Sequence, residues 1–195
     1  MGIHELLERM NLPRNHWDVK LTEISDKASH KVFITEYVES ITTNLKNGRG
    51  LYISGKHSTG KSGMSSICLK AAASKGYIGL WLSCDQIPKY IMEKYEFDEQ
   101  QSVIERAETV PILVLDEFVL NVSVDKGKKY ARIGERERMI EMLVRRRIDH
   151  KRSTIITANV GPNTFEEVYP SFYKVVTEAV DFIQTDPTKL FRPHK

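Results

Sequence analysis

Residues 55–62 read GKHSTGKS and match the pattern G-x-x-x-x-G-K-[ST] at every fixed position. An apolar run precedes this stretch and a helical pattern follows it. The pattern is typical of a phosphate-binding loop, because its glycines let backbone N–H groups turn toward a polyphosphate, while its lysine and hydroxyl reach the phosphates and Mg²⁺. The next helix adds the positive end of its dipole. The residues predicted to bind the ligand are Gly55, Lys56, His57, Ser58, Thr59, Gly60, Lys61 and Ser62.

The composition indicates one globular domain. The chain has 195 residues, of which 41% are hydrophobic, enough for a single core. With 29 Lys and Arg against 26 Asp and Glu the net charge is only +3, so any nucleic-acid binding must come from local clustering. Cys68 and Cys84 are more simply core thiols than a disulfide or metal pair. No run approaches the roughly 18 apolar residues of a membrane span, and we expect a cytoplasmic protein.

Strand and helix patterns alternate along the chain. Residues 1–11 form a short lead-in to a single domain of residues 1–195. A helix is predicted to stop at Asn47-Gly48, residues 119–133 are predicted to be an insertion loop, and Thr164 with Glu167 is predicted to be a capping box. The apolar runs that predict strands are residues 51–54, 77–82, 111–115, 153–159 and 180–184. This alternation predicts an α/β fold, with a five-stranded parallel sheet and helices on both faces.

Polar residues follow two of these strands. Asp116 and Glu117 come after residues 111–115, and Asn159 ends the next strand along the chain. Ligands of parallel sheets bind beyond the carboxyl ends of the strands. We therefore expect Asp116 to hold Mg²⁺ with Ser62, Glu117 to activate water and Asn159 to contact that water or a phosphate. The plainer alternatives are a solvated turn for the acidic pair and a turn residue for Asn159.

Together these motifs resemble those of the AAA+ ATPases, within them the DnaC/DnaI/IstB group of helicase loaders and transposase helpers. Residues 55–62 resemble Walker A, residues 112–117 Walker B, residues 154–159 the sensor 1 strand and Leu190-Phe191-Arg192 the sensor 2 tail. The resemblance implies a P-loop NTPase with strand order 5-1-4-3-2 and a minimal lid or none. It also implies ATP hydrolysis with Mg²⁺. The catalytic residues would be Lys61, Glu117, Asn159 and Arg192, and the metal ligands Ser62 and Asp116.

Two features depart from that group. No arginine lies between Arg152 and Arg192, where the group carries its arginine finger, and Lys174 is the nearest substitute. An ammonium supplies charge but not the bidentate fork of a guanidinium, so hydrolysis is expected to be weak or partner-dependent. About ten residues precede the matching region, whereas loaders of this group carry a helicase-binding domain there.

A basic, aromatic-bearing stretch follows the Walker B region. We expect single-stranded DNA to contact it, since cations can follow phosphates while an aromatic ring stacks on a base. The candidate residues are Lys126, Lys128, Lys129, Tyr130 and Arg132. The alternative is an ordinary solvated loop. A second basic run, residues 145–147 with 151–152, is more simply a solvated helix face.

Three functions remain open at this point. The first is replicative helicase loading, the second is assistance to a transposase, and the third is a nucleotide-dependent binding switch with little turnover. The expected partners are ATP, single-stranded DNA, a helicase or transposase, and further copies of the chain assembled with ATP. A small-molecule kinase is disfavoured, because phosphate transfer would not need Glu117.

Overall fold

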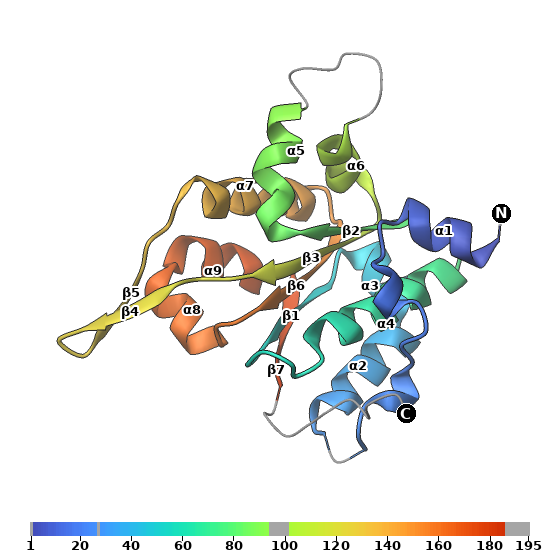
Figure 1. Ribbon diagram of the computed structural model, residues 1–195, viewed down its shortest axis with the longest axis horizontal. Helices are drawn as coiled ribbons and strands as arrows, with labels where there is room; N and C mark the ends of the chain where they lie inside the picture. The colour runs from blue at the N-terminus through green and yellow to red at the C-terminus, as the bar shows by residue number, and fades with distance from the viewer. Residues whose placement is uncertain (1, 27, 94–101, 186–195) are drawn as a thin grey trace.

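The computed structural model describes residues 2–26, 28–93 and 102–185 (Figure 1). Its α-helices are α1 (Ile3–Arg9), α2 (His30–Glu39), α3 (Ile41–Asn47), α4 (Lys61–Ser74), α5 (Ile87–Glu93), α6 (Val103–Thr109), α7 (Glu135–Asp149), α8 (Pro162–Val168) and α9 (Pro170–Thr177). Its strands are β1 (Gly50–Ser54), β2 (Gly79–Ser83), β3 (Ile112–Phe118), β4 (Val122–Asp125), β5 (Lys128–Ala131), β6 (Ser153–Ala158) and β7 (Val180–Gln184). Short 3₁₀ turns are η1 (Arg14–His16), η2 (Leu21–Glu23) and η3 (Cys84–Gln86).

Five strands form one parallel sheet in the order β2-β3-β6-β1-β7. When these five strands are numbered 1 to 5 in chain order and read across the sheet from β7, the order is 5-1-4-3-2. The predicted α/β class and strand order are therefore confirmed. Parallel neighbours need long crossover connections, and the helices supply them. All five carboxyl ends therefore lie at one edge of the sheet, where β1 leads into residues 55–62.

Helices cover both faces of the sheet (Figure 1). Side chains from α1, α2, α3 and α4 share one core with the first face, and side chains from α5 to α9 share a second core with the other. Successive strand residues point to opposite faces, so Leu51 and Ile53 enter the first core while Tyr52 enters the second. Burial on both faces explains why the strands are continuous apolar runs.

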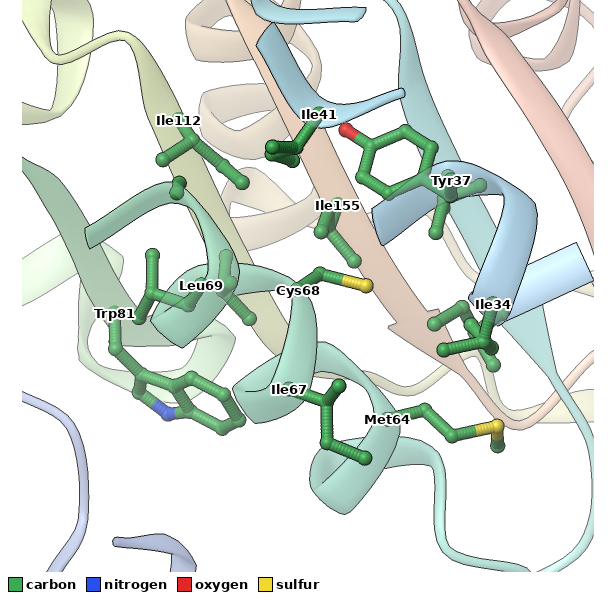
Figure 2. Close-up of a cluster of buried hydrophobic side chains, with 14 of the residues drawn as sticks. Ile34, Tyr37, Ile41, Met64, Ile67, Cys68, Leu69, Trp81, Ile112 and Ile155 are labelled. Carbon is green, nitrogen blue, oxygen red and sulfur yellow. The ribbon is translucent and has the colours of Figure 1, made fainter. Parts of the chain in front are cut away.

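The first core surrounds α4, the helix that follows the predicted phosphate loop. Figure 2 shows Cys68 of α4 in its middle, between Leu69 and Trp81 on one side and Tyr37 on the other. The Cys68 thiol is fully buried, and burial raises its pKa to about 12. Cys84 is also buried and unpaired, so the prediction of two core thiols is confirmed.

The second core is rich in aromatic rings. The Tyr52 ring stacks on Phe165 of α8 at 5.1 Å between centroids, and Phe118 meets Phe172 of α9 edge-on at 5.5 Å. Such pairs add about 0.5–1.5 kcal/mol beyond their buried area. Phe118 is fully buried and directly follows Glu117, so this cluster fixes the chain at the end of β3.

The prediction of an insertion loop at residues 119–133 is wrong. The chain there forms an antiparallel hairpin of β4 and β5, which Figure 1 shows extending away from the sheet beyond α8. Its two turn residues, Lys126 and Gly127, have φ values of +48° and +80°. Positive φ at both positions suits the twist of a two-residue hairpin turn, and glycine adopts it without strain.

Two local predictions about helices also fail. The single helix predicted to end at Asn47-Gly48 is divided at Ser40 into α2 and α3, where the Asn44 side chain donates to the carbonyl of Tyr37 at 3.1 Å and caps α2. Its predicted stop is confirmed, because Gly48 is left-handed with φ +70°. Thr164 and Glu167 do not cap α8, because that helix begins at Pro162 and both side chains contact Lys129 of the hairpin.

The amino-terminal lead-in packs as part of the domain. Leu7 and Met10 are buried in the first core, and the Trp81 N–H donates to the Met10 carbonyl at 2.8 Å. The predicted lid and the Arg192 tail fall on residues 186–195, outside the described residues. No helix among the described segments has the length and hydropathy of a membrane span.

Candidate nucleotide-binding site

The predicted phosphate loop connects the end of β1 to the start of α4. Gly55 and Gly60 have φ values of +152° and +83°, which L-residues rarely adopt. The Lys61 ammonium folds back over the loop and donates to the carbonyls of Gly55 at 3.0 Å and Lys56 at 2.7 Å. Burial lowers the pKa of Lys61, and the charges of Asp116 and Glu117 act against that change. The loop thus holds the Lys61 ammonium at the amino end of a 14-residue helix, and this arrangement is suited to binding an anion.

Asp116 and Ser62 meet at the mouth of this loop. The Ser62 hydroxyl donates to Asp116 Oδ1 at 2.9 Å, and the carboxylate is 9% exposed. Adjacent ligands of a magnesium octahedron with bonds of about 2.1 Å lie about 3 Å apart, so the two oxygens fit neighbouring positions around Mg²⁺. The described residues contain no group of three or more His, Cys, Asp or Glu side chains that could hold a metal ion by itself. The ion would therefore need phosphate oxygens and water to complete its shell, as expected where Mg²⁺ arrives with a nucleotide.

A β-bulge separates Asp116 from Glu117. The pairing of β3 with β6 shifts between Leu115 and Phe118, and Glu117 has a φ of +61°. Such conformations of non-glycine residues cluster at functional sites, and bulges redirect side chains. The Asp116 carboxylate consequently points inward to Ser62, while the Glu117 side chain is exposed and lines the same hollow as the loop.

Thr157 of β6 holds both acidic residues in place. Its hydroxyl donates to Asp116 Oδ1 at 2.6 Å and accepts the Glu117 backbone N–H at 2.9 Å. One hydroxyl thereby fixes the carboxylate and the bulge together. Thr157 was not among the predicted site residues. Its place beside Asn159 in the polar end of the strand was the available signal.

A hollow of about 220 Å³ joins these groups. It is lined by His16, Val119 and residues 57–63, 117 and 157–159. His16 was not predicted: it comes from η1, and its ring lies against Trp81 with centroids 5.6 Å apart. Lys70 of α4 donates to the His16 carbonyl at 2.8 Å and so ties this segment to the loop helix. Burial lowers the pKa of His16, the Asp116 charge opposes this and Lys70 reinforces it.

Asn159 lines the hollow as predicted, but its amide is engaged. Its Nδ2 donates to the Leu120 carbonyl at 3.0 Å, and its Oδ1 accepts the Leu120 N–H at 2.9 Å. This pair of bonds connects the end of β6 to the start of the hairpin connection. A phosphate contact by Asn159 stays a prediction and would require these bonds to open.

The other predicted site residues lie elsewhere. Arg192 belongs to residues 186–195, outside the described residues. Lys174 is exposed on α9. Arg147, in the second basic run, is fully buried, and its guanidinium donates to the Val110 carbonyl at 3.0 Å and to Thr154 Oγ1 at 2.9 Å. Arg147 therefore connects α7 to the sheet through buried hydrogen bonds. The prediction of a solvated basic face is wrong for this residue.

Successive residues of β5 face α8 and solvent in turn. Lys129 donates through its backbone N–H to Glu167 at 3.0 Å and through its ammonium to Thr164 at 3.1 Å. Its neighbours Lys128 and Tyr130 point to the opposite face, because side chains alternate along a strand, and both are exposed. Lys126 in the turn and Arg132 just beyond β5 are exposed as well.

Several solved structures share this fold. The crystal structure of the DnaC helicase loader superposes with a TM-score of 0.71 at 19% identity, covering 89% of this chain and 100% of that one. The crystal structure of DnaI gives 0.67 at 14% identity, covering 91% and 94%. The replication initiator DnaA bound to AMPPCP and single-stranded DNA gives 0.65 at 15% identity, covering 90% of this chain and 52% of that one.

Sequence comparison adds nothing to these matches, because no protein-family model matches the chain and no curated protein is significantly similar to it. At identities below 20% the structural matches establish the fold. The chain therefore shares its fold with the structures of the DnaC helicase loader and DnaI.

Proposed function

We propose that this protein binds ATP with Mg²⁺ at residues 55–62, hydrolyses it, and acts in DNA replication as a DnaC-like loader of a replicative helicase. The observation that carries the proposal is the hydrogen bond of Ser62 to Asp116, at 2.9 Å between the two oxygens, next to Lys61 in the loop. A cation, a hydroxyl and a carboxylate there are the groups that an Mg²⁺–nucleotide complex requires. Structural likeness to helicase loaders and to DnaA supports the replication context.

Each residue would have a separate task in hydrolysis. Lys61 would leave its two loop carbonyls and bind the β- and γ-phosphates, while Ser62 and Asp116 would hold Mg²⁺, which when bound would neutralise phosphate charge. Glu117, exposed at the hollow, would accept the proton of the attacking water. Thr157 would keep Asp116 and Glu117 at fixed positions. Asn159 would sense the γ-phosphate, and Arg192 or Lys174 would supply further positive charge.

A nucleotide-dependent switch with little turnover is the second candidate. Two observations favour it: no arginine occurs between Arg152 and Arg192, and the Asn159 amide is held by Leu120. In such a protein ATP would change the assembly of the chain with itself or with a helicase, and hydrolysis would be slow until a partner completed the site. An IstB-like helper of a transposase would share the same nucleotide chemistry and a cytoplasmic location.

A single set of measurements tests these proposals. Phosphate release is measured without DNA and with single- or double-stranded DNA, and particle size is measured in ATP and in ADP. We expect larger particles in ATP than in ADP and faster release with single-stranded DNA. Assembly in ATP without release would favour the switch, and filaments on double-stranded DNA the transposase helper. If neither quantity responds to ATP, the AAA+ proposal is wrong.

We propose that single-stranded DNA contacts the exposed face of the hairpin. Replacing Tyr130 with Ala is expected to weaken binding about 5- to 150-fold, because stacking of one base on an aromatic ring contributes about 1–3 kcal/mol. Lys128→Ala and Arg132→Ala should each reduce the salt dependence of binding by about one unit of slope or less. Fluorescence anisotropy with a labelled oligonucleotide at several salt concentrations measures both.

Lys129→Ala is the matched control for this surface. It lies between Lys128 and Tyr130 in sequence but faces Glu167, with 3.5 Å between the ammonium and the carboxylate. We expect little change in DNA affinity for this variant. Equal losses for Lys129→Ala and Lys128→Ala would mean that non-specific charge, and not the outer face of the hairpin, attracts DNA.

A further inference from the structure

We infer that Thr185, the residue after β7, is a positioning residue for the phosphate-binding loop and increases the affinity of the protein for ATP. The inference rests on the proposed function, since it concerns the same loop. Thr185 lies outside every motif of the site. It is 131 residues beyond Ser54, the residue that precedes the loop. The sheet brings the two together, because β7 pairs with β1, whose end begins the loop.

Thr185 is bonded to the loop through its backbone and its hydroxyl. The residue is 4% exposed, and its N–H donates to the Ser54 carbonyl at 2.7 Å. Its hydroxyl lies 3.0 Å from the same carbonyl and 2.8 Å from Thr59 Oγ1. Because the N–H already satisfies the Ser54 carbonyl, the single hydroxyl proton is available for Thr59.

From Thr59 the connection continues to Lys61. The Thr59 hydroxyl has one proton, and it donates to the Lys56 carbonyl at 2.9 Å. That carbonyl also accepts the Lys61 ammonium at 2.7 Å. By donating to the Thr59 oxygen, Thr185 leaves the Thr59 proton directed at the Lys56 carbonyl. A chain of hydrogen bonds thus runs from the end of β7 to the cation of the loop.

This series of hydrogen bonds affects the cost of moving Lys61 when a nucleotide binds. The Lys61 ammonium must leave the Lys56 carbonyl to reach the phosphates, and an unpaired carbonyl in the loop would then oppose binding. The Thr59 hydroxyl keeps that carbonyl paired, provided that Thr185 holds it. Gly55 supplies the necessary space, since a Cβ at that position would lie 1.9 Å from Thr185 Oγ1. The loop is therefore held ready for phosphate by a residue outside it.

The test replaces the hydroxyl while keeping the shape. In Thr185→Val a methyl group takes the place of the hydroxyl, and Thr185→Ser retains the hydroxyl. Calorimetric titration with ATP and Mg²⁺, well below the melting temperature of each variant, gives Kd. We expect Thr185→Val to raise Kd about tenfold, the equivalent of about one hydrogen bond, and Thr185→Ser to restore wild-type affinity. Thr109→Val is the control, because its hydroxyl bonds to carbonyls of its own helix α6, which precedes the amino end of β3, away from the loop.

A double-mutant cycle with Thr59→Val tests the connection itself. If Thr185 acts through Thr59, Thr185→Val adds little to the loss caused by Thr59→Val. Fully additive losses, a lower melting temperature of the free protein with unchanged Kd, or a Thr185→Ser variant as weak as Thr185→Val would each overturn the inference. Wild-type protein that binds no ATP would overturn the proposed function and this inference with it, whereas wild-type binding with unchanged Thr185→Val overturns this inference alone.

Discussion

Glu117→Gln is expected to lower the rate of ATP hydrolysis at least about 100-fold while leaving the Kd for ATP unchanged, because general base catalysis contributes about 10²–10⁴-fold. The glutamine amide has the size of the carboxylate but cannot accept a proton. Binding should persist, since the Glu117 side chain is exposed and the bulge is held through its backbone N–H, which donates to Thr157 at 2.9 Å. Phosphate release under the DNA condition that gives the fastest wild-type rate measures the first quantity, and calorimetry the second.

Glu166→Gln is the matched control for this substitution. It makes the same chemical change at an exposed position of α8, close to the hairpin contact but outside the hollow. Its hydrolysis rate should equal that of the wild type. Glu117→Gln protein that hydrolyses ATP at the wild-type rate would show that another group accepts the proton, and Glu117 would then be only a bulge residue.

The sequence was sufficient to predict the sheet and the loop because these are local patterns. Buried parallel strands are continuous apolar runs, and Gly55, Gly60 and Lys61 stand at fixed spacing. The hairpin of β4 and β5 was missed for a physical reason. Val122 and Val124 alternate with polar residues over four positions only, β5 (Lys128–Ala131) begins with two lysines, and α8 stabilises the hairpin from more than 30 residues away through Lys129.

The parts of the site that the sequence did not reveal depend on contacts between distant residues. Thr157 binds Asp116 and Glu117 across 41 and 40 residues, and Asn159 binds Leu120 across 39. Only the alignment of β3 with β6 makes them neighbours. The same alignment gives Asn159 a structural task, its two hydrogen bonds with Leu120. The binding of a γ-phosphate by Asn159 would accordingly release the connection to the hairpin.

Lys61→Met is expected to raise the Kd for ATP at least about 100-fold, equivalent to about 2.7 kcal/mol, because it removes charge-assisted hydrogen bonds to two phosphates. The free protein should change little. The Lys56 carbonyl keeps the Thr59 hydroxyl as a partner at 2.9 Å, and the methionine stem retains the packing of the lysine. At an ATP concentration of about 100 times Kd, the wild type should gain about 2.7 kcal/mol of stability from the ligand, and Lys61→Met almost none.

Thermal unfolding with and without ATP and Mg²⁺ gives this difference directly. Lys75→Met is the control, since it removes an exposed ammonium from the other end of α4 without touching the loop. The control should show the full ligand-induced rise in melting temperature. Equal rises for Lys61→Met and wild type would mean that the Lys61 ammonium stays on the loop carbonyls when ATP binds. The loop backbone and the dipole of α4 would then hold the phosphates unaided.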